Sequence, residues 1–276
     1  MFKIIPGGKM DSNSSNDLNS PDSSSQNPQE IQETELSHTD KIAGVYSEPV
    51  KTFETTAKFP LRTIDWLLPI IILLILSIIS QFILFNNPEV SYQMQQKQRE
   101  AVEKMVQEGK ITQEQADKQA QFMSGSVMVV IRSVSTLIFG FIFFLIIGGI
   151  YFLFCRFALK GEGTYVSALV ANGLTAYISM LQIILVTAAS LMLGRAMQDV
   201  SAASLLGMDK ASFGGWLLSF VDIITIWSFA VLSIGLAKLF KSKTMGKYFI
   251  LVFGLWIVWK ILIFSLSSAV PFLKNF

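Results

Sequence analysis

The chain has few of the residues on which most enzymatic and metal chemistry depends. Its 276 residues include one cysteine, Cys155, and one histidine, His38. A single cysteine excludes an intrachain disulfide and a cysteine-based metal site, and a single histidine leaves little for a histidine base or a histidine-rich metal centre. We also find no Ser-His-Asp set and no metal-ligand spacing, so we expect no catalytic activity, no cofactor and no bound metal.

Charged residues are scarce as well. They make up 15% of the chain, whereas a soluble domain has about 25%, and hydrophobic residues make up 51%. The net charge is only +2, and no basic stripe with interleaved aromatic residues occurs, so nucleic acid is excluded as a partner. The composition instead indicates that the lipid bilayer is the main surrounding of the protein.

Long apolar runs account for most of the chain, and each is close to the roughly 20 residues that a membrane-crossing helix needs. The five runs cover about residues 66–85, 127–155, 165–193, 223–240 and 247–268. The third is the least apolar, which predicts that the other helices enclose it, because polar groups avoid lipid. We therefore expect an all-α membrane protein built as a five-span helical bundle.

The distribution of lysine and arginine predicts the orientation of these spans. The turn between the fourth and fifth spans carries four lysines within ten residues, Lys238, Lys241, Lys243 and Lys247. The long segment after the first span has basic residues too, but it has acidic residues in similar number. We therefore expect the N-terminus in the cytoplasm and the C-terminus outside.

The segments that flank the spans are polar. Residues 1–43 contain a stretch rich in Ser, Asn, Asp, Gln and Pro, which cannot bury enough apolar surface to fold, and no apolar stretch long enough for a secretory signal. We expect this region to be a disordered tail, either simply solvated or binding a partner. Residues 44–65 are expected to be an amphipathic cytosolic segment before the first span, and 269–276 a short C-terminal tail.

Residues 89–125 are predicted to form a helical hairpin outside the membrane. Helix-forming residues run to Gly109, a natural helix stop, and Thr112 and Gln115 then match a capping box that starts a second helix. The apolar residues of the first helix lie near one face, so the hairpin packs either on itself or on a partner. These apolar residues are Met94, Ala101, Val102, Met105 and Val106.

Three segments together resemble Yip-domain membrane proteins, and the bacterial branch in particular. The segment 42–70, "IAGVYSEPVKTFETTAKFPLRTIDWLLPI", is similar to the stretch that leads into their first span. The segment 161–181, "GEGTYVSALVANGLTAYISML", is similar to their glycine-rich turn before the third span, and 221–238, "VDIITIWSFAVLSIGLAK", to their fourth span. No single motif is diagnostic, but their order along residues 42–268 is specific.

The resemblance implies a five-span bundle with a cytosolic N-terminus in a bacterial cytoplasmic membrane, without enzymatic chemistry. Eukaryotic relatives of this family bind Rab-type GTPases in vesicle traffic. This role is not carried over, because the 89–125 hairpin is similar to the bacterial branch, which lacks that partner system. We expect a membrane scaffold or protein-interaction partner that contacts other membrane proteins. The alternative is a transporter or channel for ions or small solutes, although no internal repeat supports it.

Polar residues inside the spans are the candidates for either function. Asp222 is interpreted as the N-cap of a span that starts at Ile223, and the alternative is a functional intramembrane carboxylate. Arg132 is expected to reach the headgroups, or else to pair with Asp222. Lys260 is expected either to reach the outer headgroups or to be buried with a partner. For the alternative function, the polar path would be lined by Asn172, Gln182, Asp222 and Lys260.

Two further patterns are given structural interpretations. Gly161 and Gly163 lie in a glycine-rich turn, but no Gly-Lys-Ser/Thr follows, so no nucleotide site is expected. The tryptophans near span ends are typical of an interfacial belt. They are Trp66, Trp216, Trp227, Trp256 and Trp259.

Overall fold

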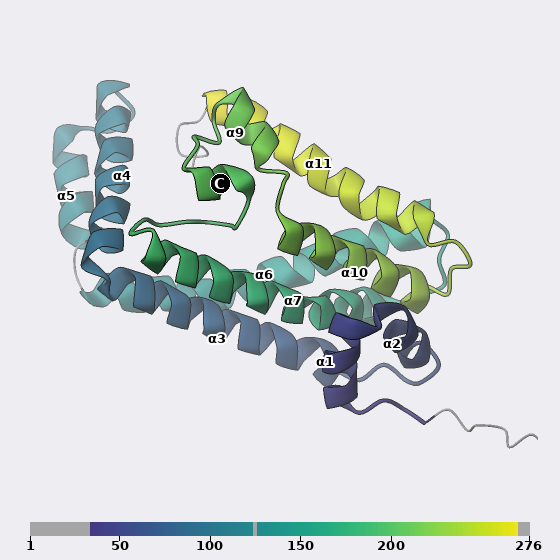
Figure 1. Cartoon of the computed structure of the whole chain (residues 1–276). Coiled ribbons are helices and arrows are strands. Elements are labelled where there is room, and N and C mark those ends of the chain that lie inside the picture. Colours follow the sequence, from purple (N-terminus) through teal and green to yellow (C-terminus); the bar gives the residue numbers. More distant parts are fainter. Residues whose placement is uncertain (1–33, 124–125, 270–276) are drawn as a thin grey trace, which may run out of the picture. The chain divides into compact units, whose positions relative to one another are not determined.

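The computed structural model describes residues 34–123 and 126–269, and regular structure in these two ranges is helical throughout, without a strand (Figure 1). The predicted tail 1–33 and residues 270–276 lie outside the described residues. The long apolar helices are α3 (Ile64–Asn86), α6 (Ser126–Leu153), α7 (Tyr165–Met192), α10 (Ile223–Leu239) and α11 (Gly246–Ala269).

Four described helical segments are long and apolar enough to cross a membrane, namely Ile64–Asn86, Val130–Ala158, Tyr165–Met192 and Gly246–Leu266. The second of these joins α6 to a π-helical turn, η1 (Phe154–Ala158). The expected fourth span corresponds to α10, which is apolar but has only 17 residues. The chain is thus a multi-pass membrane protein with four candidate spans and one shorter apolar helix.

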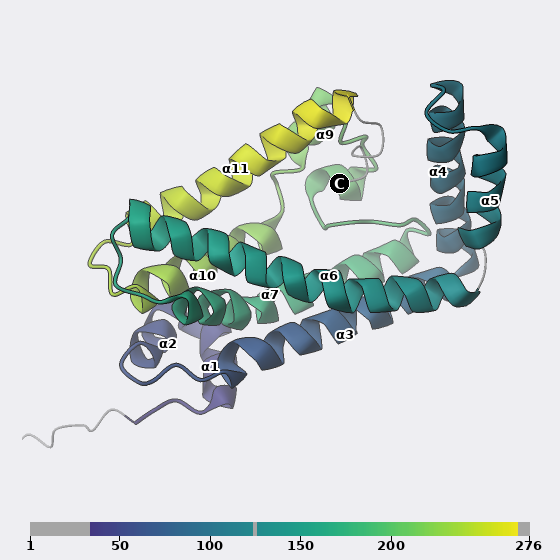
Figure 2. The same cartoon turned by 180° about the vertical axis from the view of Figure 1, so that it is seen from behind.

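Helix α7 is the central helix of the bundle. It packs against α3 and α10 (Figure 1) and also against α6 (Figure 2). In the most apolar stretch of α7, 61% is buried inside the protein. The corresponding values are 22% for α3, 17% for the span Val130–Ala158 and 6% for α11. The prediction that the third span is the most enclosed is therefore confirmed. Its fully buried Leu174 and Ile178 form an apolar core with Val231 and Leu236 of α10.

Large apolar side chains cover the outward faces of α3, α6 and α11. Phe82 is 57% exposed, Phe139 68% and Ile250 77%. Soluble proteins rarely expose continuous apolar surface of this kind, whereas lipid tails cover it without loss. This surface follows from the sequence, because these three helices are apolar around most of their circumference.

Two N-terminal helices, α1 (His38–Ser47) and α2 (Pro49–Thr56), pack against the bundle, α1 on α7 and α2 on α10. We expected a disordered tail to end at residue 43 and an amphipathic segment to begin at residue 44. This boundary is wrong, because it falls inside α1. Ser37 and Asp40 form a capping box that starts α1, and the fully buried Val45 and Phe53 hold the pair in place. The sequence prediction missed this capping box, because it relied on the average polar composition of residues 1–43.

Helices α4 (Pro88–Gln107) and α5 (Gln113–Met123) occupy most of the range predicted as a hairpin. Gly109 lies between them with a φ of 68°, which glycine adopts without strain. The Gln115 amide donates to Thr112 Oγ1 at 3.2 Å, and the Thr112 amide donates to Gln115 Oε1 at 2.9 Å, which is the geometry of a capping box. The five apolar residues predicted to lie near one face of α4 are half-buried, and Ala116 of α5 is buried.

The long connection between α7 and α10 contains two short helices, α8 (Ala202–Leu206) and α9 (Phe213–Leu218). Each begins at a serine whose side chain accepts a hydrogen bond from a backbone amide, Ser201 for α8 and Ser212 for α9. This connection leaves the end of α7 and returns to Gln182, ten residues before that end, where α10 begins.

Candidate functional site

A buried ion pair ties α1 to the first residues of α3. Lys41 Nζ lies 2.5 Å from Asp65 Oδ2, and both side chains are almost completely buried, at 2% and 1% exposure. Desolvating two charges is unfavourable, so such a pair persists only where further hydrogen bonds satisfy the remaining lone pairs. The geometry around Asp65 supplies them.

His38 provides the second partner of Asp65 and extends the contact to α7. Its Nδ1 lies 2.9 Å from Asp65 Oδ1, and its Nε2 lies 2.8 Å from the hydroxyl of Tyr177. A neutral His38 with its proton on Nδ1 satisfies both contacts, because it donates to the carboxylate and accepts from the phenol. We call His38, Lys41, Asp65 and Tyr177 the N-terminal cluster.

Tyr46 adds a contact between α1 and the middle of the bundle. Its hydroxyl donates to the backbone oxygen of Tyr177 at 2.5 Å, and its ring lies 5.6 Å from the ring of Trp227 on α10. Partial burial of the phenol raises the pKa of Tyr46. Trp227, which we expected to be an interfacial residue, therefore helps to seat α1.

The N-terminal cluster was not predicted from the sequence. His38 and Lys41 are three residues apart, so they lie on one face of a helix, and Asp65 opens the first apolar run. Together with the Ser37–Asp40 capping box, this spacing is the signal that could have indicated the contact. The chemistry of the cluster is structural, because its acidic and basic groups are paired with each other.

A second polar cluster contains two of the predicted residues, Gln182 and Asp222. Asp222 is the N-cap of α10, and its Oδ1 accepts hydrogen bonds from the amides of Ile224 and Thr225, each at 3.1 Å. Its Oδ2 accepts from Gln182 Nε2 at 3.1 Å, and the same amide nitrogen lies 3.2 Å from Thr225 Oγ1. We call Gln182, Asp222 and Thr225 the Asp222 cluster.

The structure does not bring the remaining candidates into the Asp222 cluster. Arg132 lies on α6 beside residues of α3, so the expected alternative in which it pairs with Asp222 is wrong. Asn172 precedes Gln182 by ten residues on α7, or about 15 Å along the helix axis. Asn172 is only half-buried and lies well away from the carboxylate.

Lys260 is half-buried and directed at the connection between α9 and α10. Its Nζ lies 3.1 Å from Ser219 Oγ and 5.8 Å from the centre of the Phe220 ring. Its backbone oxygen accepts a hydrogen bond from Trp216 Nε1 at 3.3 Å. The partners of the Lys260 ammonium are thus a hydroxyl and an aromatic face.

Removing the Asp222 carboxylate is expected to weaken the start of α10. An Asp222→Ala variant leaves two backbone amides and Gln182 without their acceptor, so we expect a loss of about 1–2 kcal/mol in the free energy of unfolding. Thermal melting in detergent measures it. Asp222→Asn keeps an acceptor oxygen for the cap, so it should lose less than alanine does, and an equal or larger loss would contradict the capping role.

Asp199 fixes the connection that precedes α8. Burial by itself raises the pKa of Asp199, but hydrogen bonds from Lys210, Ser201 and Ser204, together with the Lys210 charge, outweigh burial and lower the pKa to about 2. The Lys210 Nζ lies 2.6 Å from the carboxylate. This contact joins the start of the connection to the residues just before α9.

The lowered pKa of Asp199 makes a pH-dependent contribution to stability. The contribution is present above the ordinary pKa of 3.8 and is lost as the pH falls toward about 2, because protonation then removes the contacts. We expect the difference in melting temperature between wild type and Asp199→Asn to be constant above pH 4 and to shrink below it. A difference that grows on acidification would contradict this assignment.

Most of the chain matches the model of a known protein family. The Yip1 domain model matches residues 43–267, which include the described helices from the second half of α1 to nearly all of α11. The chain belongs to the Yip1 domain family. No curated protein and no solved structure matches the chain.

Membership in the Yip1 domain family agrees with the apolar helical bundle. Among the described residues, no group of three or more His, Cys, Asp or Glu side chains could hold a metal ion. The match includes Lys41's partner Asp65 and both residues of the Gln182–Asp222 contact. In this Yip1 domain, the two clusters therefore lie within or directly against the matched region.

Proposed function

We propose that this Yip1 domain protein is a non-enzymatic membrane scaffold or interaction partner in a bacterial cytoplasmic membrane. In this proposal the N-terminus is cytoplasmic, the C-terminus is outside, and α10 also crosses the membrane, as the fourth of five spans. A helix of 17 residues is about 25 Å long, at the lower end of what crosses a bilayer core. Partners are the lipid bilayer and other membrane proteins, and no nucleic acid or nucleotide is bound.

The observation that carries the proposal is the fixed seating of α1 and α2 on the bundle. Phe53 of α2 is fully buried and its ring would collide with a side chain at Gly235 of α10, so the two helices are in close contact. On the side of these two helices that faces away from the bundle, Glu48, Val50 and Lys51 remain exposed. A rigid surface loses little conformational entropy on binding, which suits a scaffold.

The transporter alternative rests on the Gln182–Asp222 contact and on Lys260. Both oxygens of Asp222 already accept hydrogen bonds, from the cap amides and from Gln182. In a transport site, polar groups must release their hydrogen-bond partners to bind a solute. A helix cap instead keeps its hydrogen bonds to the backbone amides at all times. This difference favours the scaffold over the transporter. It also identifies Asp222 and Lys260 as the residues to substitute in the experiment.

The test compares solute flux with membrane-protein binding in the same set of variants. Wild type, Asp222→Asn, Lys260→Met and a variant with 91–124 replaced by a short Gly-Ser linker are reconstituted in proteoliposomes and, separately, affinity-purified from native membranes. We expect no flux in any of them, and membrane proteins that co-purify with wild type and both point variants but not with the deletion. Flux in wild type that Asp222→Asn and Lys260→Met abolish without unfolding would overturn the proposal.

The proposed orientation is tested by labelling single cysteines from one side of the membrane. In a Cys155→Ser background, Ser242→Cys lies between α10 and α11, and Gln107→Cys lies at the end of α4. An impermeant maleimide added outside intact cells should label position 107 and leave position 242 unlabelled. The reverse pattern would invert the orientation, and equal labelling would remove α10 as a span.

A further inference from the structure

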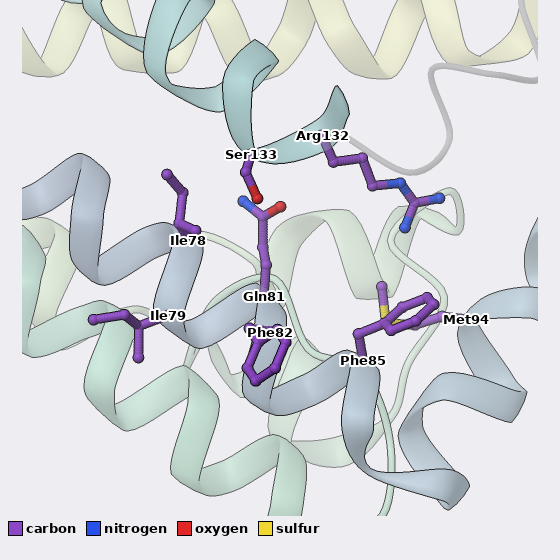
Figure 3. A pocket seen from close by; sticks show the side chains of 8 residues that line it. All are labelled: Ile78, Ile79, Gln81, Phe82, Phe85, Met94, Arg132 and Ser133. Atoms are coloured by element: carbon purple, nitrogen blue, oxygen red, sulfur yellow. The ribbon is translucent and has the colours of Figure 1, made fainter. Parts of the chain in front are cut away.

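A pocket with a volume of about 250 Å³ lies where the last turns of α3 meet the first turns of α6, with α4 close by. Figure 3 shows the side chains around it, with Arg132 and Ser133 on α6, Met94 on α4 and the other lining residues on α3. The lining consists of Ile78, Ile79, Gln81, Phe82, Phe85, Met94, Arg132 and Ser133.

The floor of the pocket is apolar and continues onto the outer surface of α3. Ile79 is 48% exposed and Phe82 is 57% exposed, so the pocket is open toward the face that lipid covers. An aqueous solute gains nothing from such a surface, whereas a hydrocarbon chain buries itself there without losing hydrogen bonds. The shape and chemistry of this part therefore fit an acyl chain.

The other end of the pocket is cationic. Arg132 is the third residue of the candidate span Val130–Ala158, and Gln81 precedes the end of α3 by five residues, so both lie near the same edge of the bundle. In the part of the chain that the structure describes, no carboxylate forms an ion pair with Arg132. The Gln81 amide donates to Thr136 Oγ1 at 3.2 Å and adds a polar group to the lining beside Ser133.

We propose that this pocket binds an anionic phospholipid, with the phosphate on Arg132 and one acyl chain along Ile79 and Phe82. A guanidinium binds phosphate through two parallel hydrogen bonds, and its position near the end of two spans is the depth of the headgroups. Anionic lipid is preferred over a zwitterionic lipid, because the cationic group of the latter is repelled by the positive charge of Arg132.

Native mass spectrometry of the detergent-solubilised full chain tests the proposal. The protein is equilibrated with equal amounts of phosphatidylglycerol and phosphatidylcholine that have the same acyl chains. Wild type should retain phosphatidylglycerol preferentially, and Arg132→Gln should lower the ratio of bound phosphatidylglycerol to phosphatidylcholine about tenfold, as expected for one charge-assisted contact. The matched control Arg99→Gln removes the same charge from the exposed surface of α4 and should leave the ratio unchanged.

Three outcomes would overturn the proposal. They are an unchanged ratio in Arg132→Gln, an equal fall in Arg99→Gln, and displacement of the bound lipid by millimolar inorganic phosphate, which would indicate a site for a free anion. If Arg132→Gln fails to fold, Arg132→Lys and Phe82→Ala replace it. The lysine variant keeps the charge without the paired hydrogen bonds and should show a smaller fall in the ratio, and Phe82→Ala should weaken retention of both lipids.

Discussion

An Asp65→Ala variant should lose about 3–5 kcal/mol of folding free energy, because it leaves the Lys41 ammonium buried without its counter-charge. Lys41 Nζ is 2.5 Å from the Asp65 carboxylate, and its side chain is only 2% exposed. The loss should appear as a lower melting temperature and as faster proteolytic cleavage between α2 and α3, since α1 no longer holds to α3. Both are measured on the purified protein in detergent.

A double variant and an exposed ion pair provide the controls for Asp65. Asp65→Leu combined with Lys41→Met replaces the pair with apolar groups and should recover most of the lost stability, because no charge remains to be desolvated. Lys118→Met breaks the exposed Lys118–Glu114 pair on α5 and should change the melting temperature little. If Asp65→Ala is as stable as Lys118→Met, the N-terminal cluster does not hold α1.

A Gly173→Ala variant is expected to lose about 2–3 kcal/mol of folding free energy, the upper part of the range for overpacking in a closely packed interior. A Cβ atom at Gly173 of α7 would lie 2.4 Å from the Cα of Trp66 on α3, and backbone at that distance cannot move aside as a flexible side chain can. The two helices must therefore separate. Thermal melting measures the loss, and near-ultraviolet circular dichroism reports the changed surroundings of Trp66.

Gly254 is the matched control for Gly173. It also lies inside a long helix, α11, but a Cβ at Gly254 meets nothing within 4 Å. Gly254→Ala should be neutral or slightly stabilising, because alanine is the better helix former. Equal effects of the two substitutions would show that the contact between α3 and α7 tolerates an extra methyl group.

The positions of the long helices could be predicted because their signals are local. The run predicted as the first span, 66–85, lies within α3 (Ile64–Asn86), and the break expected at Asp222 coincides with the N-cap of α10. Apolar length and capping side chains act over a few residues, so one sequence is enough to recognise them. The Thr112–Gln115 hydrogen bonds are of the same kind.

The contacts between distant segments could not be predicted in the same way. Lys41 and Asp65 are separated by 24 residues, and Gln182 and Asp222 by 40. Their pairing depends on how α1 and α10 pack on α7, which the pattern of one sequence does not contain. The polar composition before residue 44 also concealed α1, because average composition carries little information about a ten-residue helix whose buried side chains include Val45 and Lys41.

The seating of α1 and α2 has a consequence for biogenesis. A ribosome completes these two helices first, yet the surfaces they contact belong to α7 and α10, which leave it more than 100 residues later. Until then Phe53 has no partner on α10, and the Lys41–Asp65 pair lacks the cover of Tyr177. Docking of the N-terminal helices thus requires that the later part of the chain has been inserted, and a chain truncated before α10 leaves the Phe53 ring without its contact at Gly235.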